Sequence, residues 1–183
     1  MKKVVALSLA MALCLSCACA FAAGSKTTSN VVYTVPTVTE TAPEVVVVAP
    51  TAESQAVLDE IASFVEAGKP AVEYFEEDVK TAIAAAIPAT VKAEDLKVDE
   101  FFPVVVLNKT ASGSAQVKLS TAASYKATDA VVTLLGIIRN GKTVWTVVPC
   151  AIVDGKIVVD LTADMLAQIN SGSAVISILS NKN

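Results

Sequence analysis

The chain has 183 residues, of which 54% are hydrophobic and 17% are charged. This length suits one domain or one and a half, and the composition excludes a wholly disordered polypeptide because the apolar side chains suffice for a packed core. The formal net charge of −4 argues against a surface that binds nucleic acid phosphates or anionic lipids. We therefore expect no nucleic acid partner.

The first 22 residues have the pattern of a secretory signal peptide. Two lysines follow Met1, residues 4–19 are apolar but short for a membrane span, and residues 20–22 have the small-x-small form that a signal peptidase recognises. We predict cleavage after Ala22 or Ala23. The mature protein would then be exported and would keep no membrane span.

The cysteines separate into two groups at this cleavage site. Three of the four leave with the signal peptide, so the mature chain keeps Cys150 and cannot form an internal disulfide. A lipoprotein acylated at Cys17 or Cys19 is the alternative, although the residues before these cysteines fit that processing poorly. We expect a secreted or extracellular protein, with association to the cell surface as a further option.

Residues 23–50 are rich in Thr, Val and Pro and show no helical periodicity, which predicts an extended spacer. The valine run at residues 45–48 interrupts that pattern. Such a run is β-prone and would be an aggregation hazard if it were left free. Two interpretations stay open for it: an edge strand docked on a sheet, or part of a flexible linker.

Residues 51–88 predict a helical hairpin. Thr51 can cap a first helix, apolar residues recur at helical spacing, and Gly68 supplies the stop. A second helix is predicted to begin at Pro70 and to end at Pro88.

This second helix carries an acidic group formed by Glu73, Glu76, Glu77 and Asp78. A cation site is one interpretation of the group. However, these positions spread around a helical cylinder, and Lys80 follows Glu76 by four residues. We interpret the group as a solvated helix face.

Residues 89–183 predict a β-rich region. One helical turn is expected within residues 92–99, and the strands are expected to begin at Phe101. Phe101 and Phe102 are adjacent in a strand, so one side chain should meet the helices and the other the sheet interior. Residues 115–119 alternate apolar and polar side chains, which predicts a half-exposed strand.

Two turn motifs between apolar runs predict successive β-hairpins. Asn140 and Asp154 are each followed by glycine, and both central positions of a type I′ turn need positive φ. A two-residue turn at Asn140 places Trp145 opposite Gly136, where the indole can cover the bare backbone. Both faces of this hairpin are apolar, so we expect a second sheet on one side and the helices on the other.

The inward-facing positions change parity between the two hairpins. Trp145 is an odd inward position in the first, whereas Cys150 is an even inward position in the second. A bulge or corner at Pro149 explains the change and would let the chain pass from one sheet to another. We interpret Cys150 as a buried, inert thiol, with a reactive thiol as the alternative.

The chain ends in a pattern of strand, short helix and strand. Thr162 is expected to cap the helix, Gly172 to close it, and residues 173–180 to form the last strand. This ending resembles the crossing between late strands of immunoglobulin-like sandwiches, although the Cys and Trp framework of antibody domains is missing. The predicted fold class is α+β, with an N-terminal helical hairpin packed on an antiparallel, immunoglobulin-like β-sandwich. The predicted structural core includes Trp145, Cys150, Gly136, Phe101 and Phe102.

Three segments carry a broader resemblance. The Phe-Phe-Pro sequence at residues 101–103, the hairpin with Trp145, and the turn at residues 153–157 resemble parts of uncharacterised exported domains from gut-type Gram-positive bacteria. The resemblance covers roughly residues 52–180. It implies no known activity.

The search for catalytic groups is mostly negative. The chain has no histidine, which excludes Ser-His-Asp and Cys-His mechanisms and His-based zinc sites. The densest carboxylate set near the predicted sheet, formally open to glycoside chemistry, is Glu94, Asp95, Asp99 and Glu100. Aromatic residues are only 5% of the chain and offer few stacking platforms for a sugar. We expect no catalytic residue, no metal site and no cofactor.

These observations favour a non-catalytic exported or surface-associated module that works by protein contact, in adhesion or assembly. Its partner would be a protein or a cell-wall component. The alternative is a small-ligand or glycan-binding protein with a cleft between the helices and the sheet. The sequence leaves the ligand-binding residues and the oligomeric state open.

Overall fold

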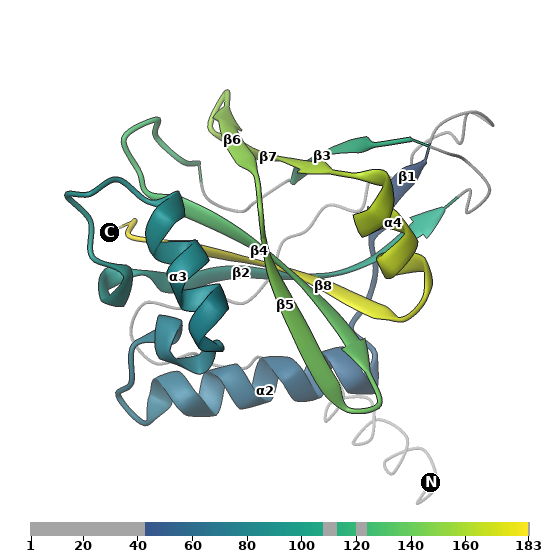
Figure 1. Ribbon diagram of the computed structural model, residues 1–183, viewed down its shortest axis with the longest axis horizontal. Coiled ribbons are helices and arrows are strands. Elements are labelled where there is room, and N and C mark those ends of the chain that lie inside the picture. The colour runs from purple at the N-terminus through teal and green to yellow at the C-terminus, as the bar shows by residue number, and fades with distance from the viewer. Residues whose placement is uncertain (1–42, 108–112, 120–123, 183) are drawn as a thin grey trace, which may run out of the picture.

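The computed structural model describes residues 43–107, 113–119 and 124–182. Within these residues the protein is an α+β fold of two antiparallel sheets and three α-helices, in which strands predominate. Figure 1 shows α2 and α3 gathered on one side of the five-stranded sheet, with the three-stranded sheet and α4 on the other. The predicted signal peptide and most of the predicted spacer lie outside the described residues. No described helix is both long and apolar enough to cross a membrane.

Two sheets form the framework. The five-stranded sheet has the order β1-β2-β8-β4-β5, and the three-stranded sheet has the order β3-β7-β6. The strands are β1 (Glu44–Val47), β2 (Lys97–Leu107), β3 (Ala115–Leu119), β4 (Val131–Arg139), β5 (Lys142–Val148), β6 (Cys150–Val153), β7 (Lys156–Leu161) and β8 (Ser173–Ser180). The α-helices are α2 (Ala52–Glu66), α3 (Glu77–Ala86) and α4 (Ala163–Asn170), and the 3-10 turns are η1 (Ala71–Tyr74) and η2 (Ala93–Asp95).

The valine run forms a docked edge strand, which decides between the two interpretations given above. β1 pairs antiparallel with β2, and Val46 lies opposite Val105. Pro43 directly precedes the strand, and proline cannot donate a ladder hydrogen bond.

The first helix forms as predicted. The hydroxyl of Thr51 accepts a hydrogen bond from the Ser54 backbone N–H, while the Ser54 hydroxyl accepts one from the Thr51 backbone N–H. This reciprocal capping box satisfies two backbone donors that would otherwise be unpaired at the start of α2.

The prediction for the second helix is wrong at its start. Instead of a helix from Pro70, the chain makes the turn η1, passes through Phe75 in an extended conformation, and begins α3 only after Glu76. Tertiary packing explains the break, because the Phe75 ring packs edge-on against Trp145 with 5.4 Å between ring centroids. An uninterrupted helix would have to give up the backbone conformation that directs this ring. Local helix propensity is too weak to compete with such a contact.

The strand that carries the two phenylalanines begins earlier than predicted, at Lys97 instead of Phe101. Its two rings separate as expected. Phe101 belongs to the helix-side core, which packs the five-stranded sheet against α2, η1 and α3. Phe102 is fully buried in the inter-sheet core, which packs the same sheet against the three-stranded sheet and α4. Sheet alternation therefore divides one apolar strand between two cores.

The first hairpin has the predicted register. Asn140 has a positive φ of 52°, as a type I′ turn requires, and Arg139 pairs with Lys142. Trp145 lies opposite Gly136, and a Cβ atom added at Gly136 would approach the Trp145 ring to 2.7 Å. The bare glycine backbone therefore makes room for the indole.

The chain changes sheets at Pro149, as the parity change predicts. β5 ends the five-stranded sheet, whereas β6 begins directly after Pro149 in the three-stranded sheet. Cys150 packs against the inter-sheet core, but its side chain is partly exposed where a buried thiol was expected. The reason is that β6 is an edge strand, so β7 covers only one of its sides. The Cys150 Sγ atom lies 3.9 Å from the Val131 carbonyl oxygen.

The C-terminal elements match their predicted positions. The hydroxyl of Thr162 accepts a hydrogen bond from the Met165 backbone N–H at the start of α4. Leu166 and Ile169 face the inter-sheet core. β8 then runs through the centre of the five-stranded sheet, between β2 and β4. The last strand of the chain therefore closes both cores.

Candidate functional site

The carboxylates proposed for glycoside chemistry lie in different environments. Glu94 and Asp95 belong to η2 and are exposed, whereas Glu100 is buried in β2. Asp99 lies between these extremes, at a register shift where β2 bulges against β8. The bulge places the Asp99 carboxylate beside the Ser180 hydroxyl, which donates a hydrogen bond to it.

Tyr125 lies close to the same bulge and is 3% exposed. Burial raises the pKa of its hydroxyl well above the usual value, and the negative charges of Asp99 and Glu100 raise it further. The ammonium group of Lys182 lies 4.7 Å from the centre of the ring. The phenol therefore stays protonated and works as a packing group at the end of the inter-sheet core.

The structure brings Asp99, Glu100 and Tyr125 together and leaves the two η2 carboxylates on the surface. Sequence spacing alone suggested one acidic set, because it could not show that Glu94 and Asp95 lie in the exposed turn η2 whereas Asp99 and Glu100 lie in β2. Within the three described ranges, no cluster of at least three Cys, Asp or Glu side chains is arranged to hold a metal ion.

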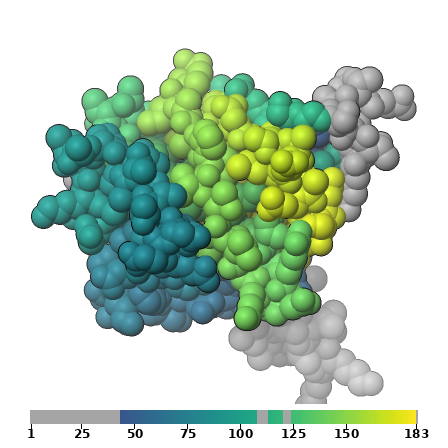
Figure 2. All heavy atoms as spheres, in the orientation of Figure 1, coloured from purple at the N-terminus to yellow at the C-terminus, as the bar shows by residue number. Residues whose placement is uncertain are grey.

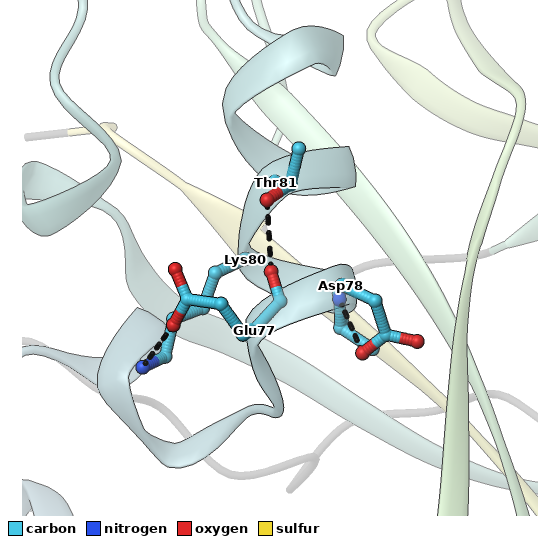
Figure 3. A network of polar contacts seen from close by, with 5 residues as sticks. Glu77, Asp78, Lys80 and Thr81 are labelled. Carbon is cyan, nitrogen blue, oxygen red and sulfur yellow. Dashed lines mark hydrogen bonds and ion pairs between the residues drawn. The ribbon is translucent and has the colours of Figure 1, made fainter.

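The four acidic residues predicted for the second helix are all exposed, but Glu73 lies in η1 and Glu76 precedes α3, so they do not share one helix face. The Lys80 ammonium lies 3.3 Å from the Glu77 carboxylate, whose side chain is 88% exposed (Figure 3). Asp78 accepts a hydrogen bond from the Val79 backbone N–H at the start of α3. The ion pair therefore spans three residues, from Glu77 to Lys80. An exposed pair of this kind contributes little to stability.

A shallow hollow of about 480 Å³ opens beside β3 and β7. Its lining includes Gln116, whose side-chain amide donates a hydrogen bond to Asp160 at 2.9 Å. Thr162, at the start of α4, lines it as well. The cleft predicted for a ligand was placed elsewhere, between the helices and the sheet. In Figure 2, atoms of α3, of the β4–β5 hairpin and of α4 cover the face that is in view.

The backbone geometry of β1 defines a third candidate. The Val48 N–H donates to the Pro103 carbonyl at 2.9 Å, so Val48 and Pro103 occupy a hydrogen-bonded position of the antiparallel ladder. Such positions alternate along a strand. Val46 is therefore also bonded to β2, whereas Val45 and Val47 direct their N–H and carbonyl groups away from it.

This outer side of β1 has no strand partner among the described residues, since β1 ends the five-stranded sheet. The side chains of Val45 and Val47 pack against the inter-sheet core. Val46 points to the opposite face, where its neighbour Val105 is 37% exposed. We call this surface the β1 edge; it comprises residues 45–47 and Val105. The valine run signalled a strand in the sequence, but nothing in the sequence showed which residues would have free backbone groups.

Among the predicted core residues, Phe102 shares the inter-sheet core with Val45 and Val47 of the β1 edge. Trp145 and Phe101 belong to the helix-side core, and Phe102 to the inter-sheet core. They build the scaffold that holds β2 and thereby position β1. Comparisons of the chain with protein-family models, with curated proteins and with solved structures found no match.

Proposed function

We propose that this protein is a non-catalytic exported module that works by protein contact, in adhesion or assembly. The observation that carries the proposal is the β1 edge. Strand edges with unpaired backbone groups are templates for another chain, and natural sheets commonly protect them with lysine, proline or a covering loop. Between its flanking prolines, β1 has a single charged residue, Glu44, and three valines.

The signal peptide at residues 1–22 would export the chain, and the Thr/Pro/Val-rich residues that follow it would separate the folded part from its point of attachment. We further propose an immunoglobulin-like connectivity for the β-rich part and a hairpin arrangement for α2 and α3. Both stay predictions.

A binding protein for a small ligand or glycan is the second candidate. The hollow beside β3 and β7 favours it, because Gln116 and Asp160 there offer amide and carboxylate groups that can bind sugar hydroxyls. The same side chains already bond to each other, so a ligand would have to replace that contact.

The test compares capture of envelope proteins by the signal-free chain and by two variants. Val46→Lys places a charge on the β1 edge, and Val144→Lys places one on a valine of β5 that is 66% exposed. We expect the wild-type chain and Val144→Lys to retain envelope protein, and Val46→Lys to lose it. Protease treatment of the envelope should abolish capture.

A glycan array and a metabolite thermal-shift screen complete the test. A glycan or metabolite that raises the melting temperature, together with no capture of envelope protein, would establish the ligand-binding function and refute the contact module. Equal capture by both lysine variants would show that the β1 edge is not the contact surface.

A further inference from the structure

We propose that the β1 edge pairs with the β1 edge of a second copy of this chain, antiparallel and about a two-fold axis at Val46. The inference rests on the proposed function and names the partner of that surface. A two-fold interface requires one patch to be complementary to itself, so that each contact occurs twice. The hydrogen bonding, side chains and charges of β1 meet this requirement.

In this register the outward backbone hydrogen-bonding groups of the two β1 strands face each other. Val45 and Val47 are the residues whose N–H and carbonyl groups point away from β2. With the axis at Val46, Val45 of one copy lies opposite Val47 of the other. Both members of each pair then point toward each other, and each of the two equivalent pairs can exchange both of its backbone hydrogen bonds. The five-stranded sheets of the two copies would become continuous.

The side chains and charges match as well. Val46 lies opposite Val46 of the second copy, in a non-hydrogen-bonded position where facing side chains come closest. Val105 borders this contact and would lose water-exposed area on pairing. Glu44 is the charged residue of the strand, and the register places it opposite Val48 of the second copy. No like charges therefore face each other directly.

The opposite edge of the same sheet is a poorer candidate. β5 begins with the exposed Lys142, a residue type that disfavours edge pairing. The chain also leaves β5 through Pro149 into the second sheet. On β1, Pro43 points its ring nitrogen to the same outer side as Val45, so it limits the pairing to a few residues. We expect a weak, reversible dimer.

Sedimentation equilibrium of the signal-free chain alone tests the pairing. We expect dimers at a protein concentration of about 1 mM or below, as for a weak contact. Val46→Lys and Val46→Glu, each measured separately, should weaken association by about tenfold or more because like charges face each other at the axis. An equimolar mixture of the two variants should restore it, because a lysine then faces a glutamate.

Val144→Lys and Val144→Glu are the matched controls, since they place the same charges on an exposed valine of β5. Both should dimerise like the wild-type chain. A wild-type chain that stays monomeric at this concentration overturns the inference. So does association that the Val46 variants leave unchanged, or that the Val144 variants abolish.

A cross-link gives an independent readout if a charged variant fails to fold. Val46→Cys in a Cys150→Ser background should form an intermolecular disulfide under mild oxidation, because facing Cα atoms in such a position are close enough for an S–S bond. Val144→Cys in the same background should not. Equal cross-linking of the two variants overturns the inference.

The two proposals fail separately. A monomeric chain that still captures envelope protein through Val46 would refute the second copy as partner and keep the contact function. The chain could instead dimerise through Val46 but capture no protein from envelopes of cells that do not contain this protein. That result would support the inference and limit the function to self-assembly.

Discussion

The two faces of the five-stranded sheet are covered in different ways. On the helix side, Trp145, Phe75, Tyr74 and Phe64 form a series of edge-on ring contacts, with centroids 5.4 to 5.9 Å apart. The inter-sheet face is covered mainly by aliphatic side chains from β7, β3 and α4. Helices can accept a few large rings in the spaces between them, whereas two facing sheets interlock many side chains of similar size.

The two faces should therefore respond differently to single substitutions. Stability of the helix side should depend on a few residues, and stability of the inter-sheet side should be spread over many. Substitutions in the helix-side core and in the inter-sheet core test this contrast.

Trp145→Ala should lower the free energy of unfolding by about 3–5 kcal/mol, because it removes a buried indole and leaves a cavity against Phe75 and Gly136. Urea unfolding followed by circular dichroism measures the change. A near-neutral result would show that the helix layer does not depend on this ring.

Gly136→Ala should cost about 1–3 kcal/mol, since the new methyl group would meet the Trp145 ring within van der Waals distance. The cause can be isolated with the double variant. If the clash with the indole is responsible, Gly136→Ala should cost much less in a Trp145→Ala background. Additive effects would assign the cost instead to the Thr143 methyl group, which lies 2.9 Å from the added Cβ atom.

Ile157→Val should cost about 0.5–1.5 kcal/mol, although this side chain is fully buried in the inter-sheet core. The small effect follows from removing one methylene group among many neighbours. The same urea experiment measures it. A loss as large as that of Trp145→Ala would contradict a distributed inter-sheet core.

Substitution of two tyrosines, one on each side of the five-stranded sheet, should change the free energy of unfolding least at neutral pH. Burial raises the pKa of Tyr74 on the helix side, assisted by its hydrogen bond to the Glu60 carboxylate at 3.0 Å. Burial also raises the pKa of Tyr125 on the inter-sheet side. A raised pKa in the folded state means that this stability is fully present below about pH 10, the unfolded value, and is lost as the pH rises further.

Tyr125→Phe should therefore flatten the fall in stability above about pH 10. Tyr74→Phe should do so less, because Tyr74 is more exposed than Tyr125. Urea unfolding at neutral and alkaline pH, with phenolate absorbance as a second signal, measures both. Equal alkaline slopes for the wild type and Tyr125→Phe would show that this phenol does not limit the folded state.

The predictability of the fold follows the range of the interactions. The turn at Asn140 and the register that places Trp145 opposite Gly136 depend on neighbouring residues, and both were predictable. The break at Phe75 was not, because a ring about 70 positions away along the chain decides it. Likewise, Cys150 had the predicted orientation but not the predicted burial, since its exposure depends on β6 having one neighbour.

At the β1 edge, too, one part was indicated by the sequence and another part only by the strand pairing. The β-prone valine run left two interpretations open, a docked edge strand or part of a linker. Only the pairing with β2 showed that Val45 and Val47 have outward backbone groups and that Val105 is their exposed neighbour.

The strand hairpins, the change of sheets at Pro149 and the capped helices α2 and α4 were predictable from the amino-acid sequence. These features depend on side-chain alternation, turn conformation and capping, which act over a few residues. How the sheet faces are covered, where the second helix begins, and which edge of the five-stranded sheet has no strand partner among the described residues follow from the tertiary structure. Those outcomes depend on contacts between segments that are distant in the chain, and local propensities are weaker than these contacts.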